Sequence, residues 1–339
     1  MTETPGKMTE TPDLARKAGM DALSDVLRVA HLTGGVFLHA EFFAPWCIAT
    51  RLSPEHCAPL LGSASHLIVY HYVVEGDLRI RIDGDEGDGV VIRAGEVVLL
   101  PRNDLHLMGS DLSLPPIPGR EIIQPPKDGG LFSIRYGGAG KRTRMVCGFL
   151  GCASAEGNPV ILSLPPLLNL KLEQGGAAEW IRSTFQYAAQ EVSSSRPGSE
   201  TVLAKVSELL FVETVRRYAE ALPDGRTGWF AGLREPHVAR ALALMHRDIT
   251  RRWTVDDLGR ETGLSRSALA ERFVRLIGTP PMQYLASWRM QVAAQDLRNT
   301  SMSLAQVAKA VGYDTEASFS RAFKKAFGVA PATWRRSTS

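Results

Sequence analysis

The sequence predicts an α+β protein with more than one domain, in which an antiparallel β-barrel with flanking helices precedes an all-α domain. Three observations predict this fold class. Short β-type runs separated by Gly and Asp turns fill residues 36–160, the apolar period becomes helical from residue 176, and a helix-turn-helix pattern occurs twice in the last hundred residues. A chain of 339 residues also has the length of about two domains.

The N-terminal part, residues 13–175, is expected to form the barrel after a flexible start at residues 1–12. A first helix is predicted over residues 13–31, where apolar residues recur at helical spacing. The β-type runs that follow are short and several alternate between apolar and polar residues, as in HLIVYHYVVEGDLRIRIDG from His66. The stretch 111–130 contains five prolines, so we expect it to be a long surface loop without regular structure.

Residues 176–222 are predicted to form a helical region. One helix covers residues 179–192, and a second covers 200–222, with Ser199 as its N-cap. The apolar band of the second helix is wide enough to cover two neighbours, so this helix either packs on the barrel alone or also joins two copies of the chain. The candidate dimer residues are Val202, Val206, Leu209, Leu210 and Glu213.

The C-terminal domain, residues 236–339, follows a linker at residues 223–235. Inside it, DDLGRETGLSRSALAERFVRLIGTPP begins at Asp256 and AQVAKAVGYDTEASFSRAFKKAFGVAP begins at Ala305. The turn glycines of the two copies are 49 residues apart and the central Phe residues are 50 apart, so the one-residue difference falls in the turn, where no packed helix has to absorb it. A short helix, a glycine turn and a second helix with an apolar i, i+4 stripe are the parts of a unit that reads duplex DNA.

The second helix of each copy is predicted to place its apolar stripe in the core and its other face toward DNA. Ser265 is the expected N-cap of the first such helix, and a helix over residues 282–298 is expected to hold the two about 34 Å apart, one turn of B-DNA. Glu271 either accepts a hydrogen bond from cytosine or pairs with Arg275 at i+4. The outward residues expected to meet DNA are Arg266, Ser267, Ala270, Glu271, Glu316, Ala317, Ser320, Arg321 and Lys324.

The charge of the chain is divided unevenly between its two parts. Residues 233–339 carry 17 Lys and Arg against 9 Asp and Glu, a net charge of +8, whereas the remaining residues carry −5, giving +3 for the whole chain. A local concentration of positive charge is what phosphate neutralisation requires. Because the charge coincides with the repeat, the sequence predicts double-stranded DNA as a partner.

Several other classes of protein are not expected. No apolar run reaches the roughly 20 residues that span a bilayer, and the N-terminus lacks the apolar segment of a secretory signal. Four cysteines are too few for a disulfide scaffold. We therefore expect a cytoplasmic protein with no membrane partner.

The second copy belongs to a long and specific block, A-x-x-x-G-[FY]-x-x-x-x-x-F-x-R-x-F-[KR]-x-x-x-G-x-x-P. It is present here as Ala308, Gly312, Tyr313, Phe319, Arg321, Phe323, Lys324, Gly328 and Pro331. This block resembles that of the AraC/XylS transcription regulators, and the resemblance extends over about residues 236–336. YVVEGDLRIRIDG and AGEVVLLPRNDLH similarly resemble the cupin-type sensor domain that is often fused to such modules.

The resemblance implies a bacterial one-component transcription activator that binds promoter DNA and RNA polymerase, responds to a small-molecule effector and forms a homodimer. The base-reading positions of the family correspond here to Ser267, Ala270, Glu271, Glu316, Ala317, Ser320 and Arg321. Glu271 departs from the long donor, Arg or Gln, that relatives often place at its position.

The metal-binding motif of cupins is only half present. Its second half matches at Gly95, Pro101, Asn103 and His106, but two Ser residues and Val69 stand where the two other His and the Glu are expected. A transition metal needs several converging ligands. We therefore expect no catalytic residue, no metal and no cofactor, and a barrel that binds an effector instead. The candidate effector contacts are Trp46, His71 and His106.

The alternative function is a cupin metalloenzyme, a dioxygenase or an isomerase, fused to a DNA-binding module. It would need a metal site of another composition in the barrel, and the candidate ligands are His71, His106, Cys147 and Cys152. The x4 spacing of the two cysteines differs from the x2 of most zinc sites, and buried free cysteines are the commoner case.

Overall fold

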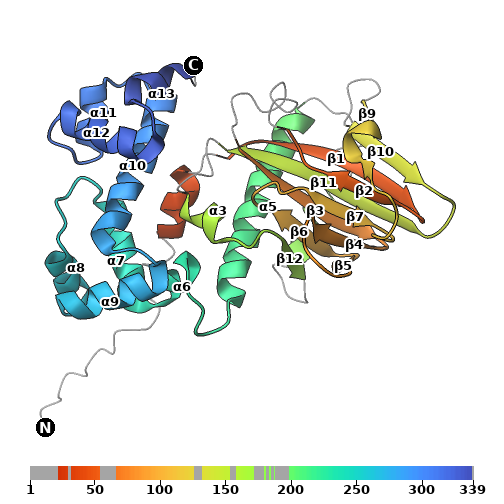
Figure 1. Cartoon of the computed structure of the whole chain (residues 1–339), viewed down its shortest axis with the longest axis horizontal. Helices are drawn as coiled ribbons and strands as arrows, with labels where there is room; N and C mark the ends of the chain where they lie inside the picture. Colours follow the sequence, from red (N-terminus) through yellow and green to blue (C-terminus); the bar gives the residue numbers. More distant parts are fainter. Residues whose placement is uncertain are drawn as a thin grey trace, which may run out of the picture. The chain divides into compact units, whose positions relative to one another are not determined.

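The computed structural model describes residues 22–29, 32–53, 66–125, 132–152, 158–171 and 198–337, together with a few positions between 179 and 187. The chain forms two compact units (Figure 1). The β-rich unit comprises residues 30–156 and 164–220, and the helical unit comprises residues 1–29, 157–163 and 221–339. Two segments that precede residue 175, the helix at 22–29 and α3 (Pro159–Ser163), thus cluster with the C-terminal half of the chain.

Two sheets make up the β-rich unit. The larger has the order β12 (Leu168–Lys171), β6 (Glu96–Leu100), β3 (His66–Glu75), β11 (Arg142–Cys152), β1 (Thr33–Phe43), β10 (Phe132–Gly137) and β9 (Ile123–Gln124). The smaller has the order β5 (Val90–Arg93), β4 (Asp77–Ile82), β7 (His106–Gly109), β2 (Cys47–Thr50) and β8 (Ile117–Pro118). Neighbouring strands are antiparallel, except that β1 pairs with β10 and β2 with β8 in parallel. The predicted antiparallel strands are confirmed, as a jelly-roll of two sheets that no strand pairing between described residues joins into a closed barrel.

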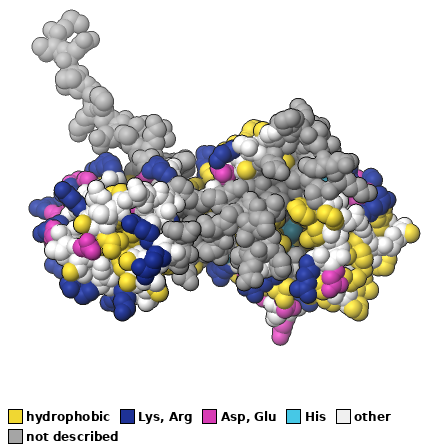
Figure 2. Space-filling model, turned by 90° about the horizontal axis from the view of Figure 1, so that it is seen from above, with side chains coloured by type: hydrophobic (Ala, Val, Ile, Leu, Met, Phe, Trp, Pro, Cys, Tyr) yellow, Lys and Arg dark blue, Asp and Glu magenta, His cyan; other side chains and the backbone are white. Residues whose placement is uncertain are grey.

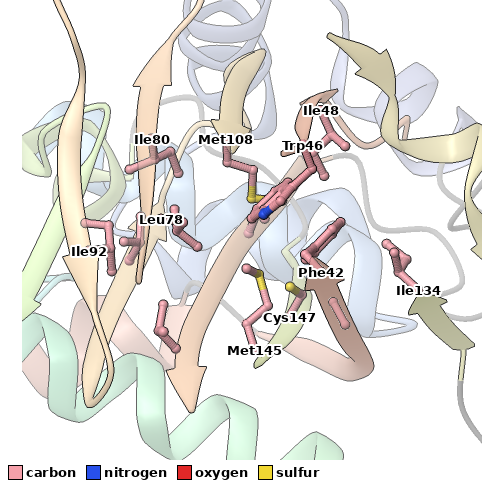
Figure 3. Close-up of a cluster of buried hydrophobic side chains, with 14 of the residues drawn as sticks. Phe42, Trp46, Ile48, Leu78, Ile80, Ile92, Met108, Ile134, Met145 and Cys147 are labelled. Atoms are coloured by element: carbon pink, nitrogen blue, oxygen red, sulfur yellow. The ribbon is translucent and has the colours of Figure 1, made fainter. Parts of the chain in front are cut away.

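The core of this unit lies between the two sheets. Phe42 of β1 and Met145 and Cys147 of β11 come from the larger sheet, and Ile80 and Met108 come from the smaller (Figure 3). Successive side chains of a strand point to opposite faces, which is why alternate residues of each strand enter this cluster. Apolar and polar residues alternate along the strands because only the inner face of each sheet is buried in this core.

The proline-rich stretch 111–130 contains more structure than the sequence predicts. Strand β8, a 3-10 turn at Gly119–Glu121 and strand β9 lie within it, so the expectation of a loop without regular structure is wrong for these residues. Both strands are two residues long and stand at the edge of their sheets. Proline is tolerated at an edge because its missing N–H faces away from the neighbouring strand.

Helix α5 (Ser199–Ala221) belongs to the β-rich unit and buries one face against it. The hydroxyl groups of Tyr70 on β3 and Ser207 on α5 share a hydrogen bond of 3.0 Å. The buried apolar residues of the helix are Leu203, Leu210, Phe211 and Val215. Tyr70 lies on the outer face of the larger sheet, so α5 covers that face.

The helical unit contains the two helix-turn-helix copies. Its C-terminal helices are α6 (Trp229–Arg234), α7 (Pro236–Arg247), α8 (Val255–Thr262), α9 (Arg266–Ile277), α10 (Pro281–Asn299), α11 (Leu304–Ala310), α12 (Glu316–Phe327) and α13 (Pro331–Ser337). Helix α6 lies inside the segment expected to be a linker, and Trp229 and Phe230 are buried there. Among the described residues, no helix combines the length and the apolar composition needed to cross a membrane.

Helix α10 contributes to two apolar cores at once. Near its start, Tyr284 packs edge-on against Phe273 of α9 and accepts a hydrogen bond of 2.9 Å from Trp229. Near its end, Ala293 and Leu297 pack with the residues of α11 and α12. Each helix-turn-helix copy therefore has its own core, and both cores include α10.

Candidate functional site

The first helix-turn-helix is fixed by caps at the starts of its two helices and by a glycine in its turn. Thr254 and Asp257 form the capping box of α8, and Ser265 caps α9 by accepting the amide of Ala268 at 3.2 Å. Gly263 ends α8 in the left-handed region, with φ of 75°, where an L side chain would be strained. These local bonds satisfy the free backbone groups at the helix ends and fix the turn between α8 and α9.

The second helix-turn-helix repeats this construction with different residues. Ser303 and Gln306 form the capping box of α11, and Thr315 caps α12 by accepting the amide of Ser318 at 3.1 Å. Gly312 takes the left-handed conformation, with φ of 80°. α12 has the same length as α9, and both end at a left-handed glycine. The two copies therefore present equivalent helices.

The residues predicted to meet DNA lie on the outward faces of α9 and α12. Leu269, Phe273, Phe319 and Phe323 are fully buried, so the opposite faces point to solvent. The predicted contacts are all exposed or half-buried: Arg266, Ser267, Ala270, Glu271, Glu316, Ala317, Ser320, Arg321 and Lys324. The geometry thus brings each set onto one accessible helix face.

Few of these side chains are engaged within the chain. Arg266 lies 3.5 Å from the carboxylate of Asp256, and both are well exposed, so solvent weakens this pair. In the described part of the chain, no ion pair joins Glu271 to Arg275, and none involves Arg321. Lys and Arg side chains are spread over the visible face of the helical unit in Figure 2. The long polar side chains are thus available for bases and phosphates.

A second candidate site lies in the core of the β-rich unit, where His71 of β3 and His106 of β7 join the two sheets. Their Nε2 atoms are 3.2 Å apart, and His106 Nδ1 donates to the carbonyl of Asp104 at 2.9 Å. Burial lowers the pKa of His106 to about 4. Burial, and secondarily His106, holds the pKa of His71 well below its usual value. Both rings are therefore neutral at pH 7.

The hydrogen bonds fix the proton positions of this pair. Since His106 Nδ1 carries a proton, its Nε2 is the acceptor, and His71 Nε2 is the donor. Nδ1 of His71 is then a bare acceptor, buried and without a hydrogen-bond partner among the residues that the structure describes. Trp46 lies in the same core (Figure 3), and its Nε1, a donor, has no partner in the described part of the chain either. Unpaired buried polar atoms are costly, which makes this acceptor and this donor the candidate polar contacts of a ligand in the core.

The four-residue metal alternative is not assembled in the structure. Cys147 lies opposite His71 on the neighbouring strand, whereas Cys152 lies opposite His66, five residues away along the strand. Among the residues that the structure describes, no three His, Cys, Asp or Glu side chains converge as metal ligands. Burial raises the pKa of the Cys147 thiol, which keeps it protonated. The four side chains therefore do not form one cluster in the described part of the chain.

The candidate dimer residues of α5 divide into two faces. Val202 and Leu209 are 37% and 49% exposed, and Val206, between them, is half-buried. Leu210 is 4% exposed and points into the unit, so it is not available to a partner. Glu213 forms ion pairs with two arginines of its own helix. Sequence periodicity alone did not separate the inner from the outer edge of this wide apolar band.

Comparisons with known proteins agree with both parts of the chain. Residues 21–220 match the family model described as Cupin, and residues 258–337 match the model described as Helix-turn-helix domain. A putative AraC-like transcription regulator of Streptomyces lividans is 31% identical over 94% of this chain and 98% of its own length. A second, from Streptomyces antibioticus, is 30% identical over 80% of this chain and 88% of its own length.

Among solved structures, a transcriptional regulator of Chromobacterium violaceum with an AraC-type DNA-binding domain is 29% identical. The match covers 31% of this chain and 95% of that one, with a TM-score of 0.30.

The buried histidine pair predicts a loss of stability in mild acid. His106 has an unfolded pKa near 6.5 and a folded pKa of about 4, so its contribution is present above pH 6.5 and is lost as the pH falls toward 4. We expect the free energy of unfolding of the β-rich unit to fall by about 2 kcal/mol from this residue between pH 7 and pH 5. Urea titrations of the wild type and His106→Gln at both pH values test this, and an equal fall in both proteins would contradict it.

Proposed function

The chain belongs to the AraC-like family of transcription regulators, so it is a DNA-binding regulator rather than an enzyme, and we propose that α9 and α12 enter two successive major grooves of one promoter. The equivalence of the two capped helices supports this proposal most directly. Helix α9 packs near the start of α10 and α12 packs near its end. The 19 residues of α10 have a length of about 28 Å. This length is comparable with the 34 Å or so between successive major grooves on one face of B-DNA.

The exposed side chains of the two helices suit different parts of the duplex. The Arg321 guanidinium fits guanine in bidentate fashion, and Glu271 fits the amino group of cytosine. Ala270 offers a methyl group to thymine. Lys324, three residues after Arg321 on α12, carries a point charge that suits a phosphate. In this proposal α12 supplies the stronger base contact, and the net charge of residues 233–339 supplies affinity for any duplex.

The second copy of the chain is proposed to bind through α5. Val202, Val206 and Leu209 recur at i, i+4 and i+7, which places them on one stripe of the helix. A homodimer doubles the number of recognition helices on one promoter, and avidity then raises the affinity for paired sites. RNA polymerase is the further partner of this proposal, with activation as the outcome in a bacterial cytoplasm.

The effector is proposed to bind between the two sheets. His71 offers an acceptor and Trp46 a donor, and the surrounding side chains are apolar. A small, largely apolar molecule with one hydroxyl-type donor and one acceptor matches this environment. Such a molecule shifts the regulator between states only by its difference in affinity for them.

Replacing Arg321 and Lys324 separately tests the sorting of base and phosphate contacts. On a duplex selected by the wild type from a random pool, Arg321→Ala should lose about 1–3 kcal/mol of binding free energy while binding unrelated duplexes nearly normally. Lys324→Ala should weaken both duplexes to the same extent. Mobility-shift titrations measure all four affinities, and identical behaviour of the two variants would contradict the proposal.

Charged residues on the α5 stripe should separate the dimer. We expect Val202→Glu with Leu209→Glu to give a monomer with weaker binding to the selected duplex, because two carboxylates would be buried against their counterparts. Thr201→Glu, on an exposed position about 100° around the helix from Val202, is the control and should remain dimeric. Light scattering measures the mass of each protein, and a folded double variant that is still dimeric would place the interface elsewhere.

Removing the Trp46 donor tests the effector site. Small hydroxylated aromatics that raise the thermal midpoint of the wild type should bind Trp46→Phe about 5- to 30-fold more weakly, since one hydrogen bond is lost while the ring remains. His66→Gln is the control, because His66 is bonded to the Pro101 carbonyl at the end of the strand. Equal affinity for the wild type and Trp46→Phe would exclude Trp46 as a contact.

A further inference from the structure

Arg289 stands at the point where α10 passes from one core to the other. Trp288 before it belongs to the first copy, where it stacks on His246 of α7 at 4.2 Å. Met290 after it belongs to the core of the second copy. Any rotation of one helix-turn-helix unit against the other about α10 must therefore occur around this position.

The guanidinium of Arg289 binds the loop between α7 and α8, in the first copy. Its Nε donates to the carbonyl of Ile249 and its Nη2 to the carbonyl of Arg251, both at 2.8 Å. The loop is itself held, since Trp253 Nε1 donates to the Asp248 carbonyl at 3.1 Å. Two parallel bonds from one planar group define a direction as well as a distance.

The turn of the second copy rests on the same guanidinium and the same loop. A Cβ on Gly312 would lie 2.9 Å from Arg289 Nη2 and 3.0 Å from the Cα and carbonyl oxygen of Thr250. A side chain at this position would have to displace the guanidinium and crowd the Thr250 backbone, and the left-handed φ of Gly312 also disfavours one. An exposed ion pair between Arg252 of the first copy and Asp314 of the second also connects the two copies at this joint, the contact between the 249–252 loop and the 312–314 turn.

We propose that Arg289, seated between the 249–251 carbonyls and Gly312, locks the two helix-turn-helix units in one orientation and so determines the half-site spacing that the protein accepts. This inference rests on the proposed reading of two major grooves. One base pair of extra spacing displaces a half-site by about 3.4 Å and turns it by about 34° around the duplex. If the orientation of the two copies is fixed, they cannot both stay on their half-sites after this change, and one set of base contacts is lost. If α10 were their only connection, the helix could twist and both copies could stay bound.

Duplexes with altered half-site spacing test whether Arg289 fixes the orientation of the two units. The duplex selected by the wild type is rebuilt with its two half-sites one or two base pairs closer or farther apart, and mobility shifts give the affinity for each. We expect the wild type to lose at least about 30-fold per base pair of change, which corresponds to about 2 kcal/mol. Arg289→Ala should bind the original duplex about 10-fold more weakly and distinguish the spacings less than about 3-fold.

The matched control is Arg335→Ala. Arg335 of α13 also donates to a main-chain carbonyl, that of Leu297 at 3.3 Å, but it connects α13 to α10 without crossing the joint. This variant should keep the spacing preference of the wild type. If Arg289→Ala does not fold, Arg289→Lys, which keeps the charge and loses the paired donors, takes its place.

The outcomes separate this inference from the proposed function. A peaked spacing profile in the wild type that is equally peaked in the Arg289 variant refutes the lock alone. A flat profile in the wild type refutes the simultaneous reading of two grooves, and the inference with it. A peaked profile that flattens only in the Arg289 variant supports both.

Discussion

The DNA-binding half of the molecule depends on one helix that is buried at both of its ends in different cores. Tyr284 and Trp288 tie the first part of α10 to α7 and α9, and Ala293 and Leu297 tie its second part to α11 and α12. Neither helix-turn-helix copy is large enough to bury much apolar surface without it. The same helix thereby supplies stability to each copy and the distance between their recognition helices.

What the sequence predicted well is local. The cap at Ser265 and the glycine after α8 act within a few residues, so their patterns can be read from the chain. The buried faces of α9 and α12 follow from the helical period. The repeat itself, with a one-residue difference in the turn, locates the recognition helices to within a residue or two.

What it did not predict depends on partners far apart in the chain. Leu210 and Leu209 are adjacent and equally apolar, yet only the structure shows that Leu210 faces the sheet. His71 and His106 meet because two sheets face each other, and Arg289 meets Gly312 because the turn of the second copy lies against the 249–251 loop of the first. The short strands in the proline-rich stretch form because the neighbouring sheets offer free edges. No local pattern contains this information.

The two compact units do not coincide with the two regions matched by family models. The cupin match covers residues 21–220, but the helix at 22–29 and α3 cluster with the helical unit, where Leu23, Val26 and Ile161 are buried. Segments of the region that matches the cupin model are thus part of the helical unit, which contains both helix-turn-helix copies. The chain therefore passes between the two units near residues 29, 156 and 163 as well as before α6. A conformational change in the β-rich unit could reach the helical unit through any of these connections.

Hydroxyl-radical footprinting of the full chain on the selected duplex tests the central claim most directly. Two recognition helices separated by α10 should protect two segments whose centres are about 10 base pairs apart on one face of the duplex for each copy of the chain. Arg321→Ala should weaken protection in one segment first. A single protected segment per copy, or two segments on opposite faces of the duplex, would contradict the account.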